Sequence, residues 1–447
     1  MKYVMKLRAD EILKACKGEL VKGSITEREF TFSTDTRSIK PGDIYIPLKG
    51  EKFDGENFIA KALEAGASGC LTTRDNIDAP LVIKVKNTLD SYMSISEYYK
   101  DKQKGLITIG ITGSSGKTTT KEMLYSVISE KFNTHKTFSN HNNEIGFCET
   151  INTMPENTEV VIIEMGMRGL GQIELIAKHA KPDIGIITNA GSAHIGILGS
   201  LDNIAKAKCE LTGFIKPDGA FIALNQDRIK KFCQFEGEKI YYTLDEVKIL
   251  EQKPSYTKFL YKENEYELNV EGLYNVENSL AAIETGLKLN MTASEIQEGL
   301  KKYHPIEKRW EVQKINGYKF INDSYNANPD SMKASVSTFM ELYPDSVVIL
   351  GDMGELGEQE TALHKEVGKY LATKPHKTSF ITVGSLAEKT GEELKRDGFA
   401  VKSFESNCEA ARYILENVNV GTTIFLKASR AMKFEEIINI IKGENTL

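Results

Sequence analysis

The chain has 447 residues, of which 40% are hydrophobic and 27% are charged, and its formal net charge is −6. This length exceeds what a single hydrophobic core supports, so about two to four domains are expected. The acidic balance argues against a nucleic-acid-binding protein, because a phosphate backbone requires a basic face.

Cysteine spacing and apolar runs exclude further classes. No two cysteines form a Cys-x-x-Cys pair, so the sequence predicts reduced thiols rather than a zinc site or a disulfide framework. Charged residues interrupt the N-terminus, and no apolar run approaches the length of a membrane span. We therefore expect a cytoplasmic protein with neither a signal peptide nor a membrane contact.

Residues 1–103 mix short strands with turns. Asp43–Leu48 predicts a strand, and Phe58–Leu63 predicts a helix that Gly66 ends. The charged stretch Lys100–Gly105 is typical of a linker. These features predict a first, small α/β domain.

Residues 104–310 alternate strands and helices. Leu106–Ile111 predicts a strand that enters a glycine loop, and apolar residues then recur at helical spacing from Met123 to Phe132. Val160–Ile163 and Ile184–Ile187 predict two further buried strands. This pattern predicts a central domain with a mostly parallel sheet covered by helices.

Residues 311–447 alternate again, which predicts a second doubly wound α/β domain. The predicted strands are Tyr318–Ile321, Val347–Leu350, Phe380–Val383 and Thr423–Leu426. The predicted helices are Asp330–Leu342, Thr361–Leu371, Cys408–Asn417 and Phe434–Ile441.

A phosphate-binding loop is the most specific motif, and it spans Gly110–Thr118. It follows a predicted strand and opens a predicted helix, which is the context that such a loop needs. Backbone N–H groups would surround phosphate oxygens, Lys117 would neutralise their charge, and Thr118 would ligate Mg²⁺. The strict spacing places glycine at Ile111, so a chance glycine-rich turn is the alternative. The strand, the helix and the Lys-Thr pair disfavour it.

Two polar residues lie at the ends of predicted strands. Glu164 directly follows Val160–Ile163, and His194 lies in the loop after Ile184–Ile187. Ligands of open α/β sheets bind beyond the carboxyl ends of the strands, so both residues are candidates for the site, with Glu164 as a Mg²⁺ ligand. The alternatives are a solvated glutamate and a structural histidine.

Lys208 falls on the apolar stripe of a helix predicted over Ser200–Ile215, seven residues after Leu201 and four after Ile204. One interpretation is a lysine whose ammonium reaches the surface. The other is an inward lysine at the active site, whose neutral amine could react with CO₂ to form an anionic carbamate that binds Mg²⁺.

The polar cluster Asn140–Gly146 allows two interpretations. It could be a plain turn, or it could be a loop that contacts phosphate or metal-bound water. The residue pattern leaves both open.

Together these motifs resemble the Mur ligases, the ATP-dependent amide-forming enzymes of peptidoglycan synthesis, over essentially the whole chain. The matching segments are Ser33–Arg37, Pro41–Asp43, Leu48–Gly50, Gly110–Thr119, Asn142, Asn143, Gly146, Glu164, His194, Lys208, Gly272–Asn278, Arg309, Asp323–Pro329, Gly351–Gly357 and Lys427–Arg430. The chain departs from the family pattern at Tyr274, Ser139, Cys148 and Gln172, where histidine, glycine, proline and glutamate are usual or frequent.

The resemblance implies three domains and a monomer. They are a UDP-sugar-binding N-terminal domain at 1–103, a central ATP-binding P-loop domain at 104–310 and a C-terminal Rossmann-like ligase domain at 311–447. Asp323–Pro329 resembles the branch that adds D-alanyl-D-alanine. The implied reaction phosphorylates the carboxylate of UDP-N-acetylmuramoyl-tripeptide with ATP and joins the acyl-phosphate to the amine of D-Ala-D-Ala.

The resemblance also implies roles for individual residues. Catalytic roles fall on Lys117, His194 and Lys208. ATP would contact Gly113, Ser114, Ser115, Gly116, Lys117, Thr118, Thr119, Asn275, Asn278, Arg309 and Asp323. Mg²⁺ would be held by Thr118, Glu164, His194 and Lys208, the last as a carbamylated lysine. The other substrates would contact Thr36, Arg37, Lys49, Gly50, Asn142, Asn143, Tyr325, Asn326, Asn328, Lys427, Ser429 and Arg430.

Other functions are compatible with parts of this pattern. A sibling ligase could add a single amino acid, and a folylpolyglutamate synthetase would share the ATP loop; the run Asp323–Pro329 argues against both. A nucleotide-binding switch or scaffold would not need a UDP-sugar domain. A small-molecule kinase would leave a stable phosphorylated product instead of an amide.

Overall fold

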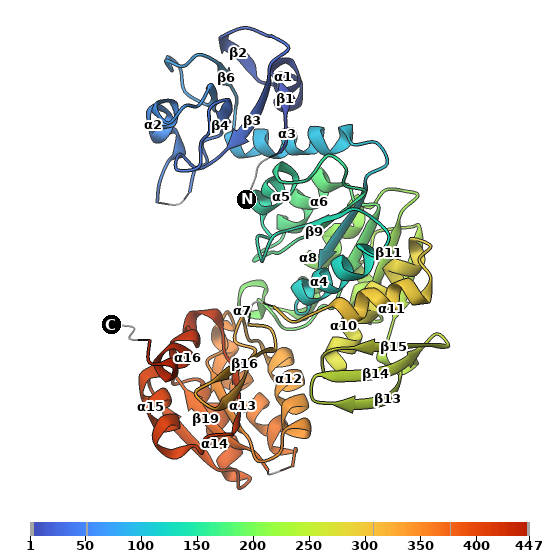
Figure 1. Ribbon diagram of the computed structural model, residues 1–447, viewed down its shortest axis with the longest axis vertical. Helices are drawn as coiled ribbons and strands as arrows, with labels where there is room; N and C mark the ends of the chain where they lie inside the picture. The colour runs from blue at the N-terminus through green and yellow to red at the C-terminus, as the bar shows by residue number, and fades with distance from the viewer. Residues whose placement is uncertain (1–3, 51, 307, 376, 445–447) are drawn as a thin grey trace.

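The described residues form four β-sheets that follow one another in chain order (Figure 1). The computed structural model describes residues 4–50, 52–306, 308–375 and 377–444, so Met1–Tyr3 of the charged N-terminus lie outside it. The N-terminal sheet lies at one end of the molecule and the C-terminal sheet at the other, with the central sheet between them (Figure 1). The predicted α/β class with parallel sheets is confirmed.

The N-terminal sheet has the strand order β1-β3-β4-β5-β6-β2, parallel from β3 to β6 and antiparallel at both edges. Its elements are β1 (Leu7–Arg8), α1 (Ala9–Cys16), β2 (Glu19–Lys22), β3 (Glu29–Ser33), β4 (Asp43–Tyr45), η1 (Gly55–Phe58), α2 (Ile59–Glu64), β5 (Gly69–Thr72), β6 (Val82–Lys84) and α3 (Thr88–Lys102). The strand predicted at Asp43–Leu48 ends at Tyr45, shortly before Pro47, which has no N–H for a strand ladder.

The linker predicted at Lys100–Gly105 is wrong over its first half. Lys100–Lys102 form the end of α3, a helix whose first turn is capped by the side chain of Asn87. Lys100 is only 4% exposed, and its ammonium pairs with Asp101. The charged run therefore ends a packed helix, because a lysine stem can lie along apolar surface.

The central sheet has the order β12-β11-β10-β7-β9-β8, and every neighbouring pair is parallel. Its strands are β7 (Ile107–Thr112), β8 (Thr134–Lys136), β9 (Val160–Glu164), β10 (Ile184–Ile187), β11 (Ala220–Leu224) and β12 (Glu238–Tyr242). The surrounding helices are α4 (Lys117–Ile128), α5 (Glu144–Asn152), α6 (Gln172–Ala180), α7 (Ile195–Leu198), α8 (Leu201–Cys209), η2 (Glu210–Phe214), α9 (Asp227–Phe232), η3 (Leu244–Glu246), α10 (Leu273–Lys288) and α11 (Ala293–Lys302).

Helices cover the central sheet on both faces, which explains why its strands are nearly continuous apolar runs. One hydrophobic core joins the sheet to α4, α10 and α11, and the other joins it to α5, α6 and α8. The helix predicted over Ser200–Ile215 is α-helical only to Cys209 and continues as the 3₁₀ turn η2.

A small antiparallel sheet lies between η3 and α10, and the sequence analysis did not predict it. It consists of β13 (Lys248–Lys253), β14 (Tyr256–Tyr261) and β15 (Asn264–Leu268). Alternate residues of β14 are buried, so only one face of this sheet contacts the core.

The C-terminal sheet has the order β16-β17-β21-β18-β19-β20 and is parallel except at β16. Its strands are β16 (Glu311–Ile315), β17 (Tyr318–Asn322), β18 (Val347–Gly351), β19 (Ser379–Val383), β20 (Val401–Phe404) and β21 (Thr423–Lys427). Its helices are α12 (Pro329–Leu342), η4 (Gly357–Gln359), α13 (Glu360–Ala372), α14 (Ala387–Arg396), α15 (Asn407–Asn417), η5 (Arg430–Met432) and α16 (Glu435–Lys442).

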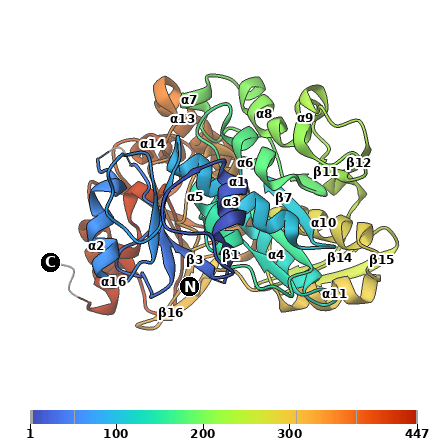
Figure 2. The same cartoon turned by 90° about the horizontal axis from the view of Figure 1, so that it is seen from above.

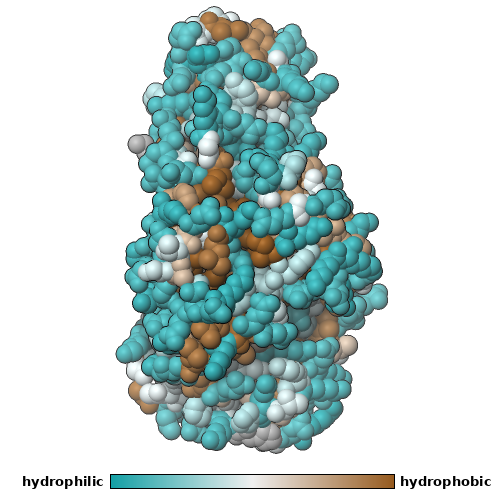
Figure 3. Space-filling view, turned by 90° about the vertical axis from the view of Figure 1, so that its right-hand side faces the viewer, coloured by the Kyte–Doolittle hydropathy of each residue, from teal (hydrophilic) through white to brown (hydrophobic). Residues whose placement is uncertain are grey.

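The central and C-terminal parts meet at α7. This short helix follows β10 of the central sheet, yet it lies beside C-terminal elements in both ribbon views and packs on η4 (Figures 1 and 2). The face drawn in Figure 3 is largely hydrophilic, with apolar residues in separate patches. Among the described helices, none is both long enough and apolar enough to cross a membrane.

Candidate active site

The predicted phosphate loop connects β7 to α4, as the sequence indicates. Gly116 has a φ of +78° and caps α4, and a Cβ at this position would lie 2.2 Å from the Asn278 Oδ1 atom. Lys117 Nζ donates to the carbonyl of Gly113 at 2.7 Å. Burial lowers the pKa of Lys117, although the charge of Glu164 opposes this shift. The loop thus presents a helix N-terminus and an ammonium group to an anion.

The two serines of the loop bind the segment that follows β10. Backbone N–H groups of Ser114 and Ser115 donate to the carbonyl and side-chain oxygens of Asn189, at 3.0 and 3.1 Å. Thr188 Oγ1 donates in return to the carbonyl of Ser115 at 2.6 Å. The phosphate loop is therefore held in one conformation by its neighbour in the sheet.

Glu164 is the last residue of β9, and its carboxylate meets the phosphate loop. The hydroxyl of Thr118 lies 3.0 and 3.1 Å from its two oxygens, and Asn142 Nδ2 donates to it at 2.9 Å. Burial opposes its charged form, but Lys121, Lys117 and the Asn142 amide together hold the pKa of Glu164 below its ordinary value. A hydroxyl beside a carboxylate offers the oxygen ligands that Mg²⁺ prefers. The contact also shows that the polar cluster at Asn142 reaches the site.

Sequence reasoning missed Lys121. Its side chain is fully buried, its ammonium donates to the carbonyl of Ser139, and it lies 3.4 Å from Glu164. It links the asparagine loop to the site carboxylate. The signal was present, because Lys121 shares an apolar stripe with Leu124 and Ile128, as Lys208 does on its own helix.

Lys208 lies on α8 with no exposed surface, which rules out the interpretation that its ammonium reaches solvent. Its Nζ atom has no hydrogen-bond partner among the described residues. Burial, and then the positive charge of Lys117, hold the pKa of Lys208 far below its ordinary value. Burial next to the positive charge of Lys117 thus favours the uncharged form of the Lys208 amine.

His194 caps α7 in a left-handed conformation, with a φ of +65°. Its Nδ1 atom lies 2.5 Å from a carboxylate oxygen of Glu355, without the alignment of a hydrogen bond. The imidazole lowers the pKa of Glu355, partly against burial. Sequence reasoning singled out the run Gly351–Gly357 but assigned no role to Glu355 within it.

The predicted metal ligands are only partly brought together. Thr118 and Glu164 are in contact, whereas neither His194 nor Lys208 hydrogen-bonds to them within the described ranges. In the same part of the chain, no three His, Cys, Asp or Glu side chains are grouped to hold a metal ion. The predicted role of His194 and carbamylated Lys208 as Mg²⁺ ligands stays a prediction.

Residues from the segment between α11 and β16 and from the carboxyl ends of β17 and β21 form a second polar group, which reaches the phosphate loop through Arg309. Arg309 Nη2 donates to the Thr118 hydroxyl at 3.0 Å, and its guanidinium lies 3.8 Å from the ring centre of Tyr325. Arg430 approaches the same ring from 5.4 Å. Lys427, which is buried, binds Asp323 at 2.6 Å. These residues were predicted from distant motifs, and the structure gathers them; Lys427 also reaches the carbonyl of Asn326.

Of the remaining predicted nucleotide residues, Asn275 and Asn278 are buried and Thr119 is half-buried, and the predicted substrate residue Ser429 is also buried. Asn278 accepts from the Thr120 hydroxyl, and Asn275 donates to the carbonyl of Glu271 at 2.7 Å. Thr119 interacts with the side chain of Tyr303. The Ser429 N–H donates to the carbonyl of Asp352, and Ser429 itself is buried.

Two asparagines predicted to bind substrate are helix caps in the structure. Asn143 accepts from the Gly146 N–H at 3.0 Å and begins α5. Asn328 accepts from the Ser331 N–H at 2.9 Å and begins α12. Their side-chain oxygens are thus already engaged by backbone donors.

The predicted UDP-sugar residues belong to the N-terminal sheet, at the end of the molecule opposite the C-terminal sheet (Figure 1). Arg37 is exposed and binds Asp35 at 2.7 Å, next to Thr36. The backbones of Lys49 and Asp54 form an isolated antiparallel β-bridge, and the Gly50 N–H donates to the carbonyl of Phe53. The structure does not bring these residues to the phosphate loop.

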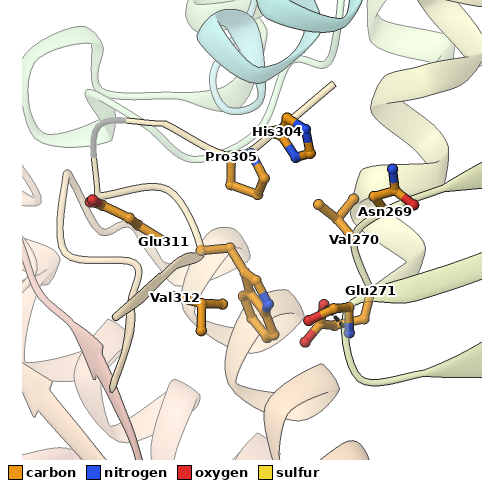
Figure 4. A pocket seen from close by; sticks show the side chains of 9 residues that line it. Asn269, Val270, Glu271, His304, Pro305, Glu311 and Val312 are labelled. Atoms are coloured by element: carbon orange, nitrogen blue, oxygen red, sulfur yellow. Dashed lines mark hydrogen bonds between the residues drawn. The ribbon is translucent and has the colours of Figure 1, made fainter. Parts of the chain in front are cut away.

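A cavity of about 460 Å³ lies where the central part connects to the C-terminal part (Figure 4). Asn269, Val270 and Glu271 face the connecting segment that carries His304 and Pro305 across it (Figure 4). The cavity contains none of the predicted site residues.

Comparison with known proteins supplies independent information. Three family models match, described as "Mur ligase family, catalytic domain" over residues 31–103, "Mur ligase middle domain" over 111–286 and "Mur ligase, glutamate ligase domain" over 308–430. The UDP-N-acetylmuramoyl-tripeptide–D-alanyl-D-alanine ligase of Bacillus subtilis is 36% identical, covering 94% of this chain and 96% of its own. The ligase of that name from Synechocystis is 32% identical over 92% of each chain.

Solved structures agree with this similarity. MurF from Acinetobacter baumannii superposes with a TM-score of 0.91 at 28% identity, covering 99% of this chain and 100% of that one. A folylpolyglutamate synthase from Thermotoga maritima reaches a TM-score of 0.55 at 15% identity, covering 78% of this chain and 92% of its own. The second similarity extends to the fold alone.

Proposed function

Since this chain belongs to the Mur ligase family, we propose that it is the ATP-dependent ligase that adds D-alanyl-D-alanine to UDP-N-acetylmuramoyl-tripeptide in peptidoglycan synthesis. Relatives of that name match nearly its full length. One observation carries the proposal: the phosphate loop contacts both the acidic end of β9, through Thr118 and Glu164, and the segment that leads into the C-terminal sheet, through Arg309.

The reaction proceeds in two steps. A carboxylate oxygen of the tripeptide attacks the γ-phosphorus of ATP, ADP leaves, and an acyl-phosphate forms. The amine of D-Ala-D-Ala then attacks the acyl carbon, and inorganic phosphate leaves with formation of the amide. Phosphoryl transfer mainly requires positioning and charge neutralisation, which Lys117, Arg309 and the N-terminus of α4 provide.

Mg²⁺ fits the oxygen ligands at the phosphate loop. Thr118 and Glu164 would hold it, since their oxygens already converge and the pKa of the Glu164 carboxyl group is lowered, which keeps it anionic. When bound, the ion would neutralise charge on the phosphate oxygens. Lys121 and Arg309 supply positive charge at this carboxylate and hydroxyl in the structure.

Carbamylation of Lys208 is part of the proposal. A neutral amine adds to CO₂ to give an N-carboxylate and releases a proton, and the lowered pKa of Lys208 favours the neutral form. The Nζ atom has no hydrogen-bond partner among the described residues, so no contact competes with its reaction with CO₂. His194 and the carbamate would hold a second Mg²⁺.

The other proposals follow from the same family. The N-terminal part would bind the UDP-sugar through Thr36, Arg37, Lys49 and Gly50. Asn142, Tyr325, Asn326 and Lys427 would contact the peptide substrates. We further propose that the protein is a cytoplasmic monomer with domains at 1–103, 104–310 and 311–447.

An ADP-release assay tests the proposed function. Release should require UDP-N-acetylmuramoyl-tripeptide and D-Ala-D-Ala together, and mass spectrometry should detect the pentapeptide product. Tripeptides ending in lysine and in diaminopimelate are both supplied. Turnover with single amino acids but not with D-Ala-D-Ala would instead identify a sibling ligase, and a stable phosphorylated product would identify a kinase.

A further inference from the structure

Glu355 stands out because it belongs to the C-terminal part but contacts a loop of the central part. It lies in the run Gly351–Gly357, which the chemistry above does not use. Its Oε2 atom is 2.5 Å from His194 Nδ1, and its backbone carbonyl accepts from the Gly196 N–H at 3.0 Å. Glu355 therefore contacts the segment that carries His194 twice. Its carboxylate lies within ion-pair distance of the imidazole, and its backbone carbonyl accepts a hydrogen bond.

The backbone on both sides of this contact is unusual. His194 and Glu355 each have a left-handed conformation, with φ values of +65° and +60°. A Cβ on Gly196 would lie 2.4 Å from the backbone nitrogen of Gly357, so only glycine permits this approach. Non-glycine residues in this conformation cost free energy and tend to persist where the surrounding structure requires them. The close fit indicates a built contact rather than an incidental surface ion pair.

The nitrogen that Glu355 faces determines what the imidazole can do. A neutral histidine has one N–H and one lone pair, and a carboxylate beside Nδ1 favours the proton on Nδ1. The lone pair then resides on Nε2, on the opposite edge of the ring. Carboxylates act in this way on histidines that bind metals, and they fix the ring orientation as well.

We propose that Glu355 is a positioning residue that holds the His194 imidazole with its Nε2 lone pair free for the site, and that it does so only when the C-terminal part is docked. The proposal rests on the role proposed above for His194. Because Glu355 belongs to the C-terminal part, undocking of that part would move its carboxylate away from His194. Docking of the C-terminal part is then a condition for a complete site.

A first test observes the imidazole itself. In protein labelled with ¹⁵N-histidine, the signal lost in His194→Ala identifies His194, and its ¹⁵N shifts report which ring nitrogen carries the proton. We expect the Nδ1–H form in the parent and a mixture, or the Nε2–H form, in Glu355→Ala. An unchanged tautomer in Glu355→Ala would overturn the proposal.

A second test measures Mn²⁺ binding by electron paramagnetic resonance with a non-hydrolysable ATP analogue present. Glu355→Ala should weaken one bound Mn²⁺ about tenfold and lower kcat more than it changes the KM for ATP. Arg168→Ala is the matched control, because Arg168 also pairs with Glu355, with its Nε atom 3.6 Å from the second carboxylate oxygen. An equal loss in Arg168→Ala would mean that Glu355 serves only as an ion-pair partner.

A double-mutant cycle separates the two proposals. If Glu355 acts through His194, adding Glu355→Ala to His194→Ala should change Mn²⁺ affinity no further. If His194→Ala itself leaves Mn²⁺ binding intact, the proposed role of His194 fails. If His194→Ala weakens binding but Glu355→Ala does not, only the role of Glu355 fails. Urea unfolding of each variant confirms that the protein remains folded.

Discussion

At the scale of single residues, two buried lysines show how differently one side chain can be accommodated. Lys121 is surrounded by the Ser139 carbonyl and the carboxylate of Glu164, so its ammonium is compensated. Lys208 is equally buried, yet its Nζ atom has no partner in the described part of the chain. Burying an unpaired amine opposes folding, and such a cost commonly marks a functional site.

This cost predicts that Lys208→Met stabilises the protein in CO₂-free buffer at pH 7, by roughly 1–3 kcal/mol in urea unfolding. The pKa of Lys208 is lowered in the native state, so between the native and unfolded pKa values the unfolded chain binds one more proton than the native protein. The free energy of unfolding of the parent therefore rises with pH over this range. The advantage of the variant should therefore shrink as the pH approaches about 10.4, the ordinary lysine pKa. A difference that is constant with pH would show that Lys208 is charged in the native state.

The carbamate predicts a specific chemical rescue. Lys208→Ala should lower turnover by more than the roughly 10–100-fold typical of losing a residue that only supports a metal ligand. Added acetate should restore part of this activity, because it can supply an anionic oxygen within the space vacated by the side chain. Lys208→Met fills that space and should not respond. Rescue of both variants by acetate would point to a general salt effect.

At the scale of elements, glycines and caps set the geometry of the loops. Gly116 combines a left-handed φ of +78° with a close approach to Asn278. We expect Gly116→Ala to cost about 1–2 kcal/mol in unfolding free energy and to weaken ADP binding in calorimetry. Gly169→Ala is the control, since a Cβ there meets no atom within 4 Å. Equal behaviour of the two variants would show that the loop tolerates rearrangement.

The cap at Asn143 allows structure and binding to be separated. Asn143→Ala removes the acceptor for the Gly146 N–H and should destabilise the protein by about 1 kcal/mol. Asn143→Ser retains a capping oxygen and should recover that stability. If Asn143 also contacts substrate, Asn143→Ser will remain low in kcat/KM. If Asn143→Ser recovers kcat/KM as well as the free energy of unfolding, Asn143 acts only as a helix cap.

At the scale of the whole molecule, polar contacts from the C-terminal part hold the loop that follows β10. Asp330 accepts from the Ser192 N–H and hydroxyl at 2.7 and 2.8 Å, and Glu355 binds the same loop a few residues later. Hydrogen bonds to a charged group contribute about 1.5–3 kcal/mol each, so loss of the Asp330 carboxylate should weaken this interface measurably.

We therefore expect Asp330→Ala to raise the radius of gyration in small-angle X-ray scattering, since it removes both hydrogen bonds from the interface. Nucleotide should reduce the increase if it binds between the two parts. Asp397→Ala, at an exposed position on the same C-terminal part, should leave the scattering unchanged. An Asp330→Ala profile identical to that of the parent would show that other contacts hold the docked state.

The sequence by itself determined the features that short segments encode. Buried strands such as Ile184–Ile187, the phosphate loop and the order of the α/β parts follow from apolar runs, glycine spacing and periodicity, which act within a few residues. The small sheet β13–β15 was missed, because its strands are short and several charged residues interrupt their alternation.

Only the tertiary structure decided how distant residues are paired. Local patterns left an inward and a solvent-reaching Lys208 both open. The absence of a partner for its Nζ atom among the described residues, the salt bridge from Lys121 to Glu164 and the contact of His194 with Glu355 depend on segments far apart in the chain. The caps at Asn143 and Asn328 likewise appear only once each helix start is fixed. Periodicity tells which side of an element is buried, whereas packing of the whole chain determines what that side meets.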